Sequence, residues 1–356
     1  MSDTVYFYKD RPLFGMDIGS SSVKVMQLET QKLHRQIAGY GVVNFDESCI
    51  SSGVITKYEE LAGSIQKMFK DGIIGNISTN RVVMSVPAAY TFSRIINLPS
   101  DIDQKDLPDA VITEIQQYLP SAINELYFDY TILASQEDQY RILTVAAKQT
   151  IINSYMNLAK LLGLEVVAME PTTSASNRLF GFTDEHKVPT VLIDFGAIST
   201  DITVYDSDLV VSGTVTGGGD HYTDAIRQAL SVTSQEAHTI KTRYGLNVSK
   251  RQNEIRQALK PLTDDIIKEV RRMVRYYEER ISDKKKEIGQ VVLLGGGANV
   301  PGLSDHLTDL LRLPVRTYDP WNTISFGKLQ LPPAGEEGIY TTSAGLALLK
   351  PEEPFV

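Results

Sequence analysis

Two short segments carry the residue types that phosphate binding needs. DIGSSSVK spans residues 17–24, and DFGAISTD spans residues 194–201. Each follows an apolar run, reads Asp-x-Gly followed by small hydroxyl residues, and precedes an alternating apolar run. This spacing predicts two β-hairpins whose tight turns need glycine and expose backbone N–H groups. Such N–H groups, together with serine and threonine hydroxyls, suit phosphate oxygens.

Each hairpin also offers charged side chains that would act on a bound phosphate. Asp17 and Asp194 would hold Mg²⁺ through water molecules, as that ion prefers, and Lys24 would neutralise phosphate charge. Either segment alone reads more simply as a glycine turn with a capping aspartate. Two copies in one chain favour a phosphate clamp between two lobes. The candidate residues are Asp17, Gly19, Ser20, Ser21, Ser22 and Lys24 in the first segment, and Asp194, Gly196, Ser199, Thr200 and Asp201 in the second.

Two further clusters are rich in glycine. VTGGGDHYTDAI, residues 215–226, leads into a helix, and VVLLGGGANVPGL, residues 291–303, begins as a buried strand. Glycines directly after a core strand let the backbone approach a flat ligand, and adenine is the obvious candidate. Neither cluster matches the P-loop or the dinucleotide-binding fingerprint, but four clusters in this order are strong evidence for a site that binds phosphate and adenine. The added candidates are Gly217, Gly218, Gly219, Gly295, Gly296, Gly297 and Asn299.

The elements that must position these clusters fall into three units. Periodicity predicts strands over residues 13–29 and 36–45 and a helix over 58–69 in the first unit. A second unit of roughly 80 residues has the size of a small domain. The third unit opens at Glu165 and runs to the C-terminus. The second unit is expected to contain strands at 81–86, 91–99, 127–133 and 141–147, a helix at 109–119 stopped by Pro120, and a helix at 149–162.

Composition excludes several classes of protein. A chain of 356 residues is long enough for two lobes, and a net charge of −9 argues against a nucleic-acid surface. Cys49 is the single cysteine, which excludes disulfides within the chain and cysteine-based metal sites. The N-terminus lacks a signal peptide's apolar core, and no apolar run approaches the ~20 residues that span a bilayer. We therefore expect a cytosolic protein that reaches a membrane only through a partner.

Taken together, the four clusters resemble phosphate-1, phosphate-2, the connecting loop and the adenosine motif of the actin superfamily. The resemblance implies an α/β, actin-like fold of two duplicated ribonuclease-H-like lobes, with ATP and Mg²⁺ as cofactors. GGGDHYTDAI is especially similar to the division protein FtsA, and the block at 81–163 resembles FtsA's inserted subdomain 1C. The implied divisions are residues 1–80 for lobe 1, 81–163 for the insert, 164–190 for a return to lobe 1, 191–335 for lobe 2 and 336–356 for a final return to lobe 1.

Longer phrases resemble the PilM family of cytoplasmic type IV pilus assembly proteins. They are FGMDIGSSSVKVMQLE, EIQQYLPSAINELYFDY, AMEPTTSASNRLF and YTTSAGLALL. This resemblance implies an ATP-binding platform at the inner face of the membrane, which holds the short cytoplasmic N-terminus of a bitopic PilN-type protein. Other pilus assembly proteins, among them the assembly ATPases, and self-association stay open as further contacts.

Three residues match the superfamily unevenly. Glu170 stands where the superfamily has an acid near the γ-phosphate and Mg²⁺, and it reads equally well as a strand-end carboxylate facing solvent. The superfamily places Glu-x-x-Lys beside the ribose, whereas here His238 replaces the glutamate and Lys241 is retained. A histidine binds a ribose hydroxyl less strongly than a carboxylate does, so weaker nucleotide affinity or altered base preference is expected.

The activity predicted from the sequence is limited. No water-positioning side chain can be assigned, so we expect at most a slow ATPase whose nucleotide biases the two lobes toward closure. The alternative is an FtsA-like cytoskeletal protein that polymerises and tethers filaments. Proteins of that type end in a basic amphipathic helix, which the closing LALLKPEEPFV does not suit. A partner peptide would contact apolar residues of the insert, which read more simply as its own core: Ile95, Ile96, Leu98 and Tyr118.

Overall fold

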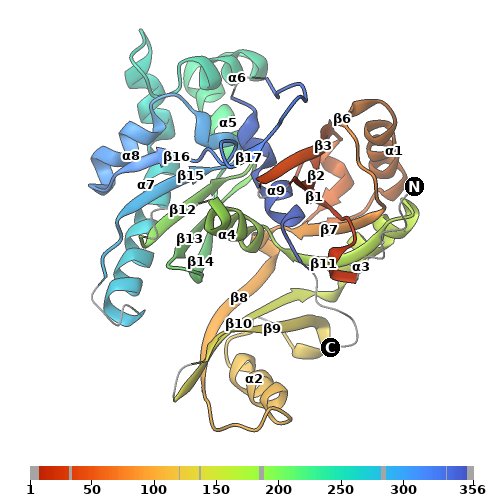
Figure 1. Cartoon of the computed structure of the whole chain (residues 1–356). Coiled ribbons are helices and arrows are strands. Elements are labelled where there is room, and N and C mark those ends of the chain that lie inside the picture. The colour runs from red at the N-terminus through yellow and green to blue at the C-terminus, as the bar shows by residue number, and fades with distance from the viewer. Residues whose placement is uncertain are drawn as a thin grey trace.

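The structure is a computed structural model that describes residues 8–31, 34–119, 121–135, 138–183, 188–281, 286–333 and 335–350. Two lobes lie side by side, with a smaller unit below them (Figure 1). The expectations for residues 1–7, for Pro120 and for residues 351–356 fall outside the described ranges. Within those ranges, no helix combines the length and the apolar composition that crossing a membrane requires.

The first lobe is built on a mixed sheet. Its strands run in the order β11-β7-β1-β2-β3-β17, and β6 pairs with β3 off this path. β1 is buried along its whole length because it lies between β2 and β7. The bounds are β1 (Phe14–Ile18), β2 (Ser22–Gln31), β3 (His34–Asn44), β6 (Ile73–Gly75), β7 (Arg81–Val86), β11 (Glu165–Pro171) and β17 (Ile324–Ser325).

Two helices fill the core of this lobe. α1 (Tyr58–Lys67) buries Leu61 and Ile65, and α3 (Gln149–Leu161) buries Ile151, Tyr155 and Leu158 in the same cluster. The buried residues recur at spacings of three and four, which puts them on one helix face. The two-stranded ribbon of β4 (Ile50–Ser51) and β5 (Val54–Ile55) lies in the loop that precedes α1.

The second lobe repeats the arrangement. Its sheet has the order β14-β13-β12-β15-β16, and β12 pairs antiparallel with β13 and parallel with β15. A large apolar core lies between this sheet and its helices. The elements are β12 (Thr190–Phe195), β13 (Ser199–Tyr205), β14 (Leu209–Thr216), α5 (Gly219–Leu230), α6 (Ser234–Arg243), α7 (Gln252–Tyr276), β15 (Gln290–Leu294), α8 (Leu303–Leu311) and β16 (Val315–Thr317).

The smaller unit is an antiparallel sheet in the order β8-β10-β9 with one helix against it. Its bounds are β8 (Thr91–Pro99), α2 (Leu107–Gln116), β9 (Leu126–Ser135) and β10 (Gln139–Lys148). The helix buries Leu107, Val111 and Ile115, at spacings of four, against Ile96 and Ile142. We call this unit, β8 to β10, the insert.

The contacts give the insert narrower limits than the expected 81–163. β7 pairs with β1 and β11 in the first sheet, and α3 packs in the core of the first lobe. The chain also returns to the first lobe earlier than 336, because β17 pairs with β3. β7 and β17 each belong to the sheet whose strands complete their hydrogen bonds, and the local sequence does not reveal which sheet that is.

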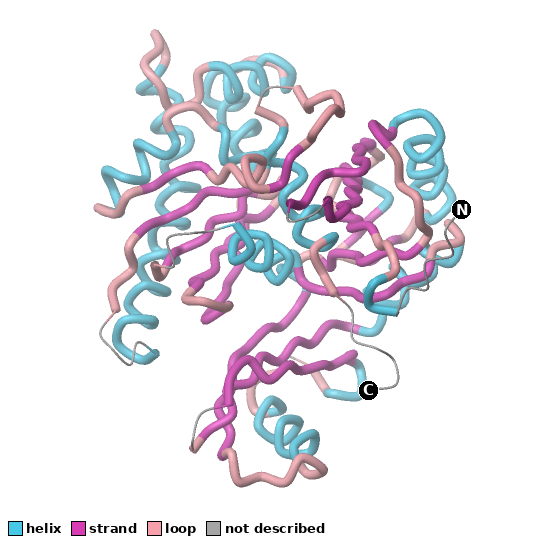
Figure 2. The backbone as a smooth tube through the Cα atoms, viewed as in Figure 1, coloured by secondary structure: helices cyan, strands magenta, loops and turns pink. Residues whose placement is uncertain are grey.

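Two helices lie between the sheets. α4 (Thr172–Thr183) and α9 (Thr341–Ala347) cross so closely that a Cβ on Gly345 would stand 2.1 Å from the carbonyl oxygen of Ala175. Around them a single apolar cluster takes residues from both lobes, among them Met26 and Ile37 from the first and Leu192 and Val292 from the second. Figure 2 shows these helices at the centre of the molecule, between the strands of the two lobes.

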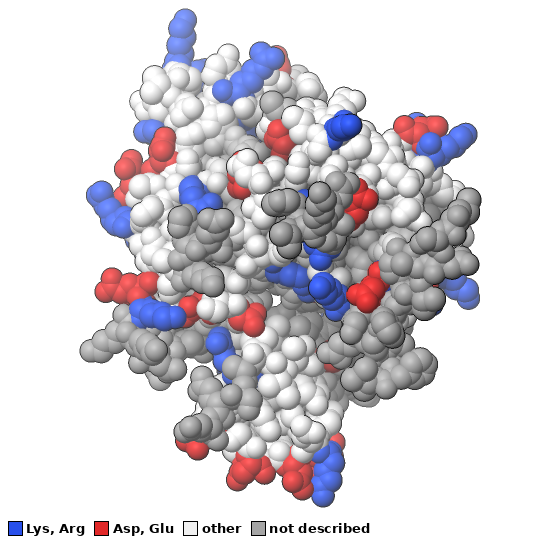
Figure 3. Space-filling model, in the orientation of Figure 1, with Lys and Arg blue, Asp and Glu red and all other residues white. Residues whose placement is uncertain are grey.

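Charged side chains on the surface are mixed in sign. On the face that Figure 3 shows, the acidic and basic side chains drawn in colour are interspersed and form no broad basic field. Nucleic acids favour such a field, so this face offers them no obvious footprint.

Candidate functional site

The two predicted hairpins have the same geometry. Asp17 faces Lys24 across β1 and β2, and Asp194 faces Asp201 across β12 and β13. In each turn the glycine N–H donates to the carbonyl oxygen three residues ahead, at 2.9 Å from Gly19 and 3.0 Å from Gly196. The repeated Asp-x-Gly pattern therefore produces a repeated turn.

Asp17 lies in a tight polar setting at the end of β1. It is 8% exposed, and the hydroxyl of Ser85 donates to its Oδ1 at 2.7 Å. Ser85 Oγ in turn accepts from the N–H of Ile18 at 3.2 Å. The ammonium of Lys24 stands 3.9 Å from Asp17 Oδ2. Within the described chain, the buried Oγ of Ser20 has no hydrogen-bond partner, so the turn holds an unused polar group.

The acids of the second hairpin are held by α4 and β14. Ser176 donates to Asp194 Oδ2 at 2.8 Å, and Thr172 donates to Asp201 Oδ2 at 3.0 Å. Thr214 on β14 donates to Asp201 Oδ1 at 2.7 Å. Thr172 and Ser176 are four residues apart, which puts both hydroxyls on one face of α4.

Charged groups of the first hairpin lie close enough to the second hairpin to affect the pKa of Asp194. Burial, and then the charge of Asp201, raises the pKa of Asp194 to about 7, and the charge of Asp17 adds to that rise. Lys24 and the Ser176 hydrogen bond act in the opposite direction. Burial also raises the pKa of Asp201, against the hydrogen bonds from Thr214 and Thr172. An excess of negative charge at this point suits a divalent cation.

The connecting loop packs directly under the second turn. The N–H groups of Gly217 and Gly219 donate to the carbonyls of Ile198 and Gly196, at 3.1 and 2.9 Å. Thr200, fully buried, donates its hydroxyl to Gly217 O at 2.7 Å. These glycine N–H groups therefore hydrogen-bond to the second turn itself, and the connecting loop supports that turn.

The two candidates on α6 have different settings. Lys241 is buried, its ammonium donates to Gly219 O at 2.8 Å, and burial lowers its pKa. His238 is exposed on the same helix. The lysine is thus tied to the connecting loop, while the histidine is free to meet a ligand.

The adenosine motif adjoins the second hairpin because β15 is the parallel neighbour of β12. A Cβ on Gly295, whose φ is +78°, would lie 2.4 Å from Asp194 Oδ1, and a Cβ on Gly297 would lie 2.7 Å from the Cβ of Phe195. Asn299, which ends the turn Gly296–Asn299, donates to Gly335 O at 2.7 Å. Glycine is needed here because the turn packs closely on Asp194 and Phe195, and Asn299 fixes the segment that leads back to α9.

Glu170 has a partner that the sequence did not suggest. Both of its carboxylate oxygens accept from the guanidinium of Arg178, which lies eight residues later, in the middle of α4. The same guanidinium donates to Gly345 O of α9 at 3.0 Å. Glu170 is thus neither a solvent-facing carboxylate nor a free acid, and its ion pair holds β11, α4 and α9 together.

The four apolar residues of the insert do not form one surface. Ile96 and Leu98 are buried under α2, so for them the simpler reading as core is right and the peptide-contact prediction is wrong. Ile95 points to the opposite face because side chains alternate along a strand. Tyr118 is 40% exposed and carries the guanidinium of Arg94 at 3.6 Å from its ring centre.

The donor set suits a nucleotide with its metal ion more than a metal ion alone. Among the residues that the structure describes, no group of three or more His, Cys, Asp or Glu side chains could hold a metal. Asp17 and Asp194 with phosphate oxygens and water would supply the octahedral shell that Mg²⁺ prefers. The unpartnered Ser20 hydroxyl fits the same group.

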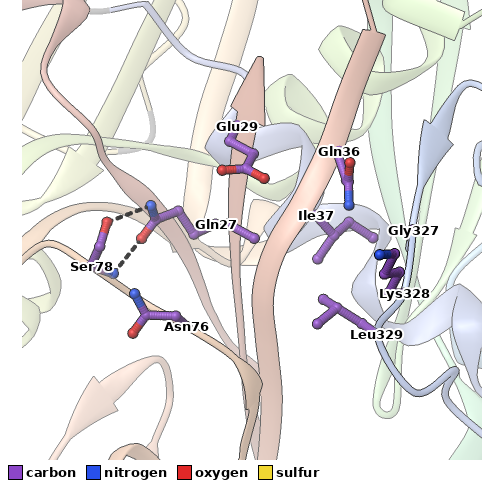
Figure 4. A pocket seen from close by; sticks show the side chains of 10 residues that line it. Gln27, Glu29, Gln36, Ile37, Asn76, Ser78, Gly327, Lys328 and Leu329 are labelled. Atoms are coloured by element: carbon purple, nitrogen blue, oxygen red, sulfur yellow. Dashed lines mark hydrogen bonds between the residues drawn. The ribbon is translucent and has the colours of Figure 1, made fainter. Parts of the chain in front are cut away.

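A hollow of about 780 Å³ lies away from this site, in the first lobe. Its walls come from β2, β3, the segment after β6 and the segment after β17 (Figure 4). Gln27 and Ser78 exchange two hydrogen bonds at its edge, at 2.8 and 2.9 Å. None of the candidate residues in the two Asp-x-Gly segments, 17–24 and 194–201, lines it.

Sequence reasoning missed the residues that orient the acids. They are Ser85, Thr172, Ser176, Arg178 and Thr214. A signal was present for three of them, because EPTTSASNR places hydroxyls and an arginine on a helix directly after a strand-end acid. Ser85 and Thr214 lie on other strands, and only the sheet pairing brings them to the site.

The fold and the paired hairpins are those of the actin-like class. A structure described as the PilM-PilN type IV pilus biogenesis complex matches with a TM-score of 0.79 at 21% identity, over 94% of this chain and 97% of that one. MreB5 of Spiroplasma citri bound to ADP matches with a TM-score of 0.51 at 14% identity, over 95% of each chain. At such identities the likeness shows the fold alone.

Within that class, the chain belongs to the PilM family of type IV pilus assembly proteins, whose sequence signature matches residues 15–350. FtsA proteins are more distant relatives. FtsA of Staphylococcus epidermidis is 22% identical over 345 residues, which cover 86% of this chain and 74% of that protein. FtsA of Pseudomonas aeruginosa is 24% identical over 383 residues, which cover 94% and 88%.

Proposed function

We propose that this chain binds Mg²⁺-ATP between its two hairpins and works as a nucleotide-dependent assembly platform of a type IV pilus. The observation that carries the proposal is the convergence of the two Asp-x-Gly turns, which brings Asp17, Lys24 and Asp201 within electrostatic reach of Asp194. The actin-like relative MreB5 was solved with ADP bound. Family membership supplies the cellular setting.

Each part of the site would have a separate role. The two turns would bind phosphate oxygens through N–H groups and serine hydroxyls, and Lys24 would offset their charge. Asp17 and Asp194 would hold Mg²⁺ through water, and the Gly295–Gly297 turn would lie against the adenine. His238 would meet the ribose from α6, and Lys241 would position the connecting loop.

Hydrolysis is expected to be slow or absent. Bound Mg²⁺ would polarise the phosphoryl oxygens, but attack also needs a side chain that orients water. Glu170 is the nearest candidate by strand position, and its carboxylate is held by Arg178. The nucleotide would then act by stabilising one relative arrangement of the lobes.

We further propose that the chain lies at the cytoplasmic face of the inner membrane and binds the N-terminal cytoplasmic peptide of a PilN-type protein. The support is the structural neighbour, which was solved as a PilM-PilN complex. The face of the insert sheet away from α2 offers a surface for an extended peptide. Ile95 and Leu143 lie opposite each other there, half-buried, with Thr131 next to them.

The test is a titration of the purified chain, with and without Mg²⁺-ATP, against two synthetic peptides. One is the cytoplasmic N-terminus of the PilN-type protein of the same genome, and the other is the C-terminal tail of its division polymer. Micromolar binding of the first alone supports the pilus platform. Binding of the division tail alone, or long filaments formed with ATP together with binding to liposomes without a partner, would favour the FtsA-like alternative.

Two cross-strand neighbours, one on β8 and one on β10, give variants that test the peptide surface. Ile95→Ser removes an apolar contact on the open face, so it should weaken peptide binding while circular dichroism stays unchanged. Leu143→Ser, its cross-strand partner, should act in the same way. Full affinity in both variants would move the peptide site off this face.

A further inference from the structure

A chain of hydrogen bonds joins the base of the insert to the second hairpin. The N–H of Ala88 donates to Thr172 Oγ1 at 3.2 Å, and Thr172 Oγ1 donates to Asp201 Oδ2 at 3.0 Å. The other oxygen of Asp201 accepts from Thr214 at 2.7 Å. A hydroxyl has one proton, so while Thr172 gives it to Asp201, its lone pairs are left to accept from Ala88.

Each member of this chain belongs to a different part of the fold. Ala88 opens the single turn Ala88–Tyr90, which connects β7 of the first lobe to β8 of the insert. Thr172 is the first residue of α4, the helix between the lobes. Asp201 lies on β13 of the second lobe, directly opposite Asp194. The insert, both lobes and the phosphate site therefore meet at one threonine.

The base of the insert also packs on the edge of the second lobe. The turn Ala88–Tyr90 contacts β13 and β14, and β8 contacts β14. In Figure 1 the insert lies below the junction of the lobes, and β8 extends from the insert toward that junction. A shift of β13 or β14 relative to the first lobe would thus be transmitted to the start of β8.

Asp201 is the member that a nucleotide would disturb. It lies directly opposite Asp194 in the hairpin that would bind the phosphate. A Mg²⁺-bound phosphate at this hairpin would draw the two carboxylates toward the cation. The length and direction of the Thr172–Asp201 hydrogen bond would change with that movement.

We propose that Thr172 is the positioning residue that couples nucleotide binding at the hairpins to the orientation of the insert. This inference rests on the proposed function, since it takes Mg²⁺-nucleotide as one ligand and a PilN-type peptide at the insert as the other. Coupling of this kind is reciprocal, so nucleotide changes peptide affinity by the same factor as peptide changes nucleotide affinity.

The experiment measures that factor. Peptide dissociation constants are determined with and without Mg²⁺-AMPPNP for the whole chain and for Thr172→Val, which keeps the shape and removes both hydrogen bonds. In the wild type the two constants should differ by about 5- to 150-fold, the usual range of allosteric coupling. In Thr172→Val their ratio should approach one, and Thr172→Ser, which restores the hydroxyl, should recover the wild-type ratio.

Thr308→Val is the matched control. Thr308 also accepts a backbone N–H, from Val315 at 3.2 Å, and donates to a carbonyl, that of Ser304 at 2.9 Å. It lies on α8, away from the insert and the hairpins, so its loss should leave the ratio unchanged. A ratio of one in the wild type, or an unchanged ratio in Thr172→Val, would overturn the inference.

A second readout does not depend on the peptide. Hydrogen exchange of residues 87–95 should slow or quicken when Mg²⁺-AMPPNP is added to the wild type and should not respond in Thr172→Val. If the peptide fails to bind but this exchange response is present, the partner is wrong and the coupling stands. If no nucleotide binds, the proposed function and this inference both fail.

Discussion

Asp194 is a buried acid with two other carboxylates near it. Its pKa is raised to about 7 by burial, by Asp201 and by Asp17. A carboxyl with a raised pKa in the folded state gives up its proton less readily there than in the unfolded chain. Folding therefore loses stability as the pH rises from the unfolded value near 4 to the folded value near 7, and loses no more above it.

Replacement of this acid should remove that pH dependence. Relative to Asp194→Asn, the free energy of unfolding of the wild type should fall by up to about 4 kcal/mol between about pH 4 and pH 7. Urea unfolding at several pH values measures it. The control is Asp265→Asn, an exposed acid on α7, which should follow the wild type. If the free energies of unfolding of Asp194→Asn and the wild type depend on pH in the same way, folding does not raise the pKa of Asp194.

The ion pair of Glu170 and Arg178 gives a second residue-scale prediction. Their side chains are 13% and 28% exposed, so Arg178→Ala strands a largely buried carboxylate and also frees Gly345 O. We expect a loss of about 1–3 kcal/mol in the free energy of unfolding, below the range for fully buried pairs.

An exposed pair serves as its comparison. Arg251, directly before α7, and Glu254 in its first turn also form a two-point contact, but with side chains 53% and 49% exposed. Arg251→Ala should cost much less stability than Arg178→Ala, because water screens such exposed pairs. Equal losses in both variants would mean that burial adds nothing to the Glu170 contact.

At the scale of elements, the connecting loop depends on close backbone approach. A Cβ on Gly218 would lie 2.5 Å from Gly196 O and 2.6 Å from the carbonyl carbon of Ala197. Gly218→Ala must therefore displace the start of α5 or the second turn. We expect at least about a tenfold loss of nucleotide affinity, or about 1.4 kcal/mol, measured by isothermal titration.

Gly63 provides a matched glycine in an open position. It is exposed on α1, and an added Cβ would meet nothing within 4 Å. Gly63→Ala should leave nucleotide affinity unchanged and stabilise the chain by about 0.5–1 kcal/mol through helix propensity. If Gly218→Ala also binds nucleotide normally, the packing of the loop under the turn is not part of the site.

The insert shows how alternation separates core from surface. Along β8, Ile96 and Leu98 face α2, and Ile95 faces away from it. The sequence of this strand is apolar at all three positions, so it did not indicate which face the helix would cover. The position of α2 decides that question.

At the scale of the whole molecule, the lobes are joined by a shared core. One apolar cluster includes Met26 from the first sheet, Leu294 from the second, and Leu179 of α4 between them. Trp321, the single tryptophan of the chain, packs against this cluster, with its ring centre 5.1 Å from that of Phe326. A core of this kind links the stabilities of the two lobes.

Unfolding should therefore be cooperative across both lobes. In urea, tryptophan fluorescence and far-ultraviolet circular dichroism should give the same unfolding midpoint. Leu179→Ala should shift the two midpoints together and lower the free energy of unfolding by about 2–5 kcal/mol. The control is Val111→Ala in the insert core, which should leave the fluorescence midpoint closer to the wild-type value. Two separate transitions in the wild type would show that the lobes unfold independently.

The sequence by itself determined the local parts of this protein. Both hairpins, the glycine turn after β15 and the order of the four clusters could be predicted, because a tight turn depends on a few adjacent residues. The likeness of those clusters to the actin superfamily and the PilM family then indicated the fold, and the family match confirmed it.

The tertiary structure decided how those parts are joined. It placed β7 and α3 in the first lobe, gave Glu170 an arginine partner and linked Ala88 to Asp201 through Thr172. These contacts join residues far apart in the chain or in different elements, and a side chain's own type does not say which distant group will neutralise or orient it. Packing of the two lobes makes that choice, because buried polar groups must find partners where the fold brings them.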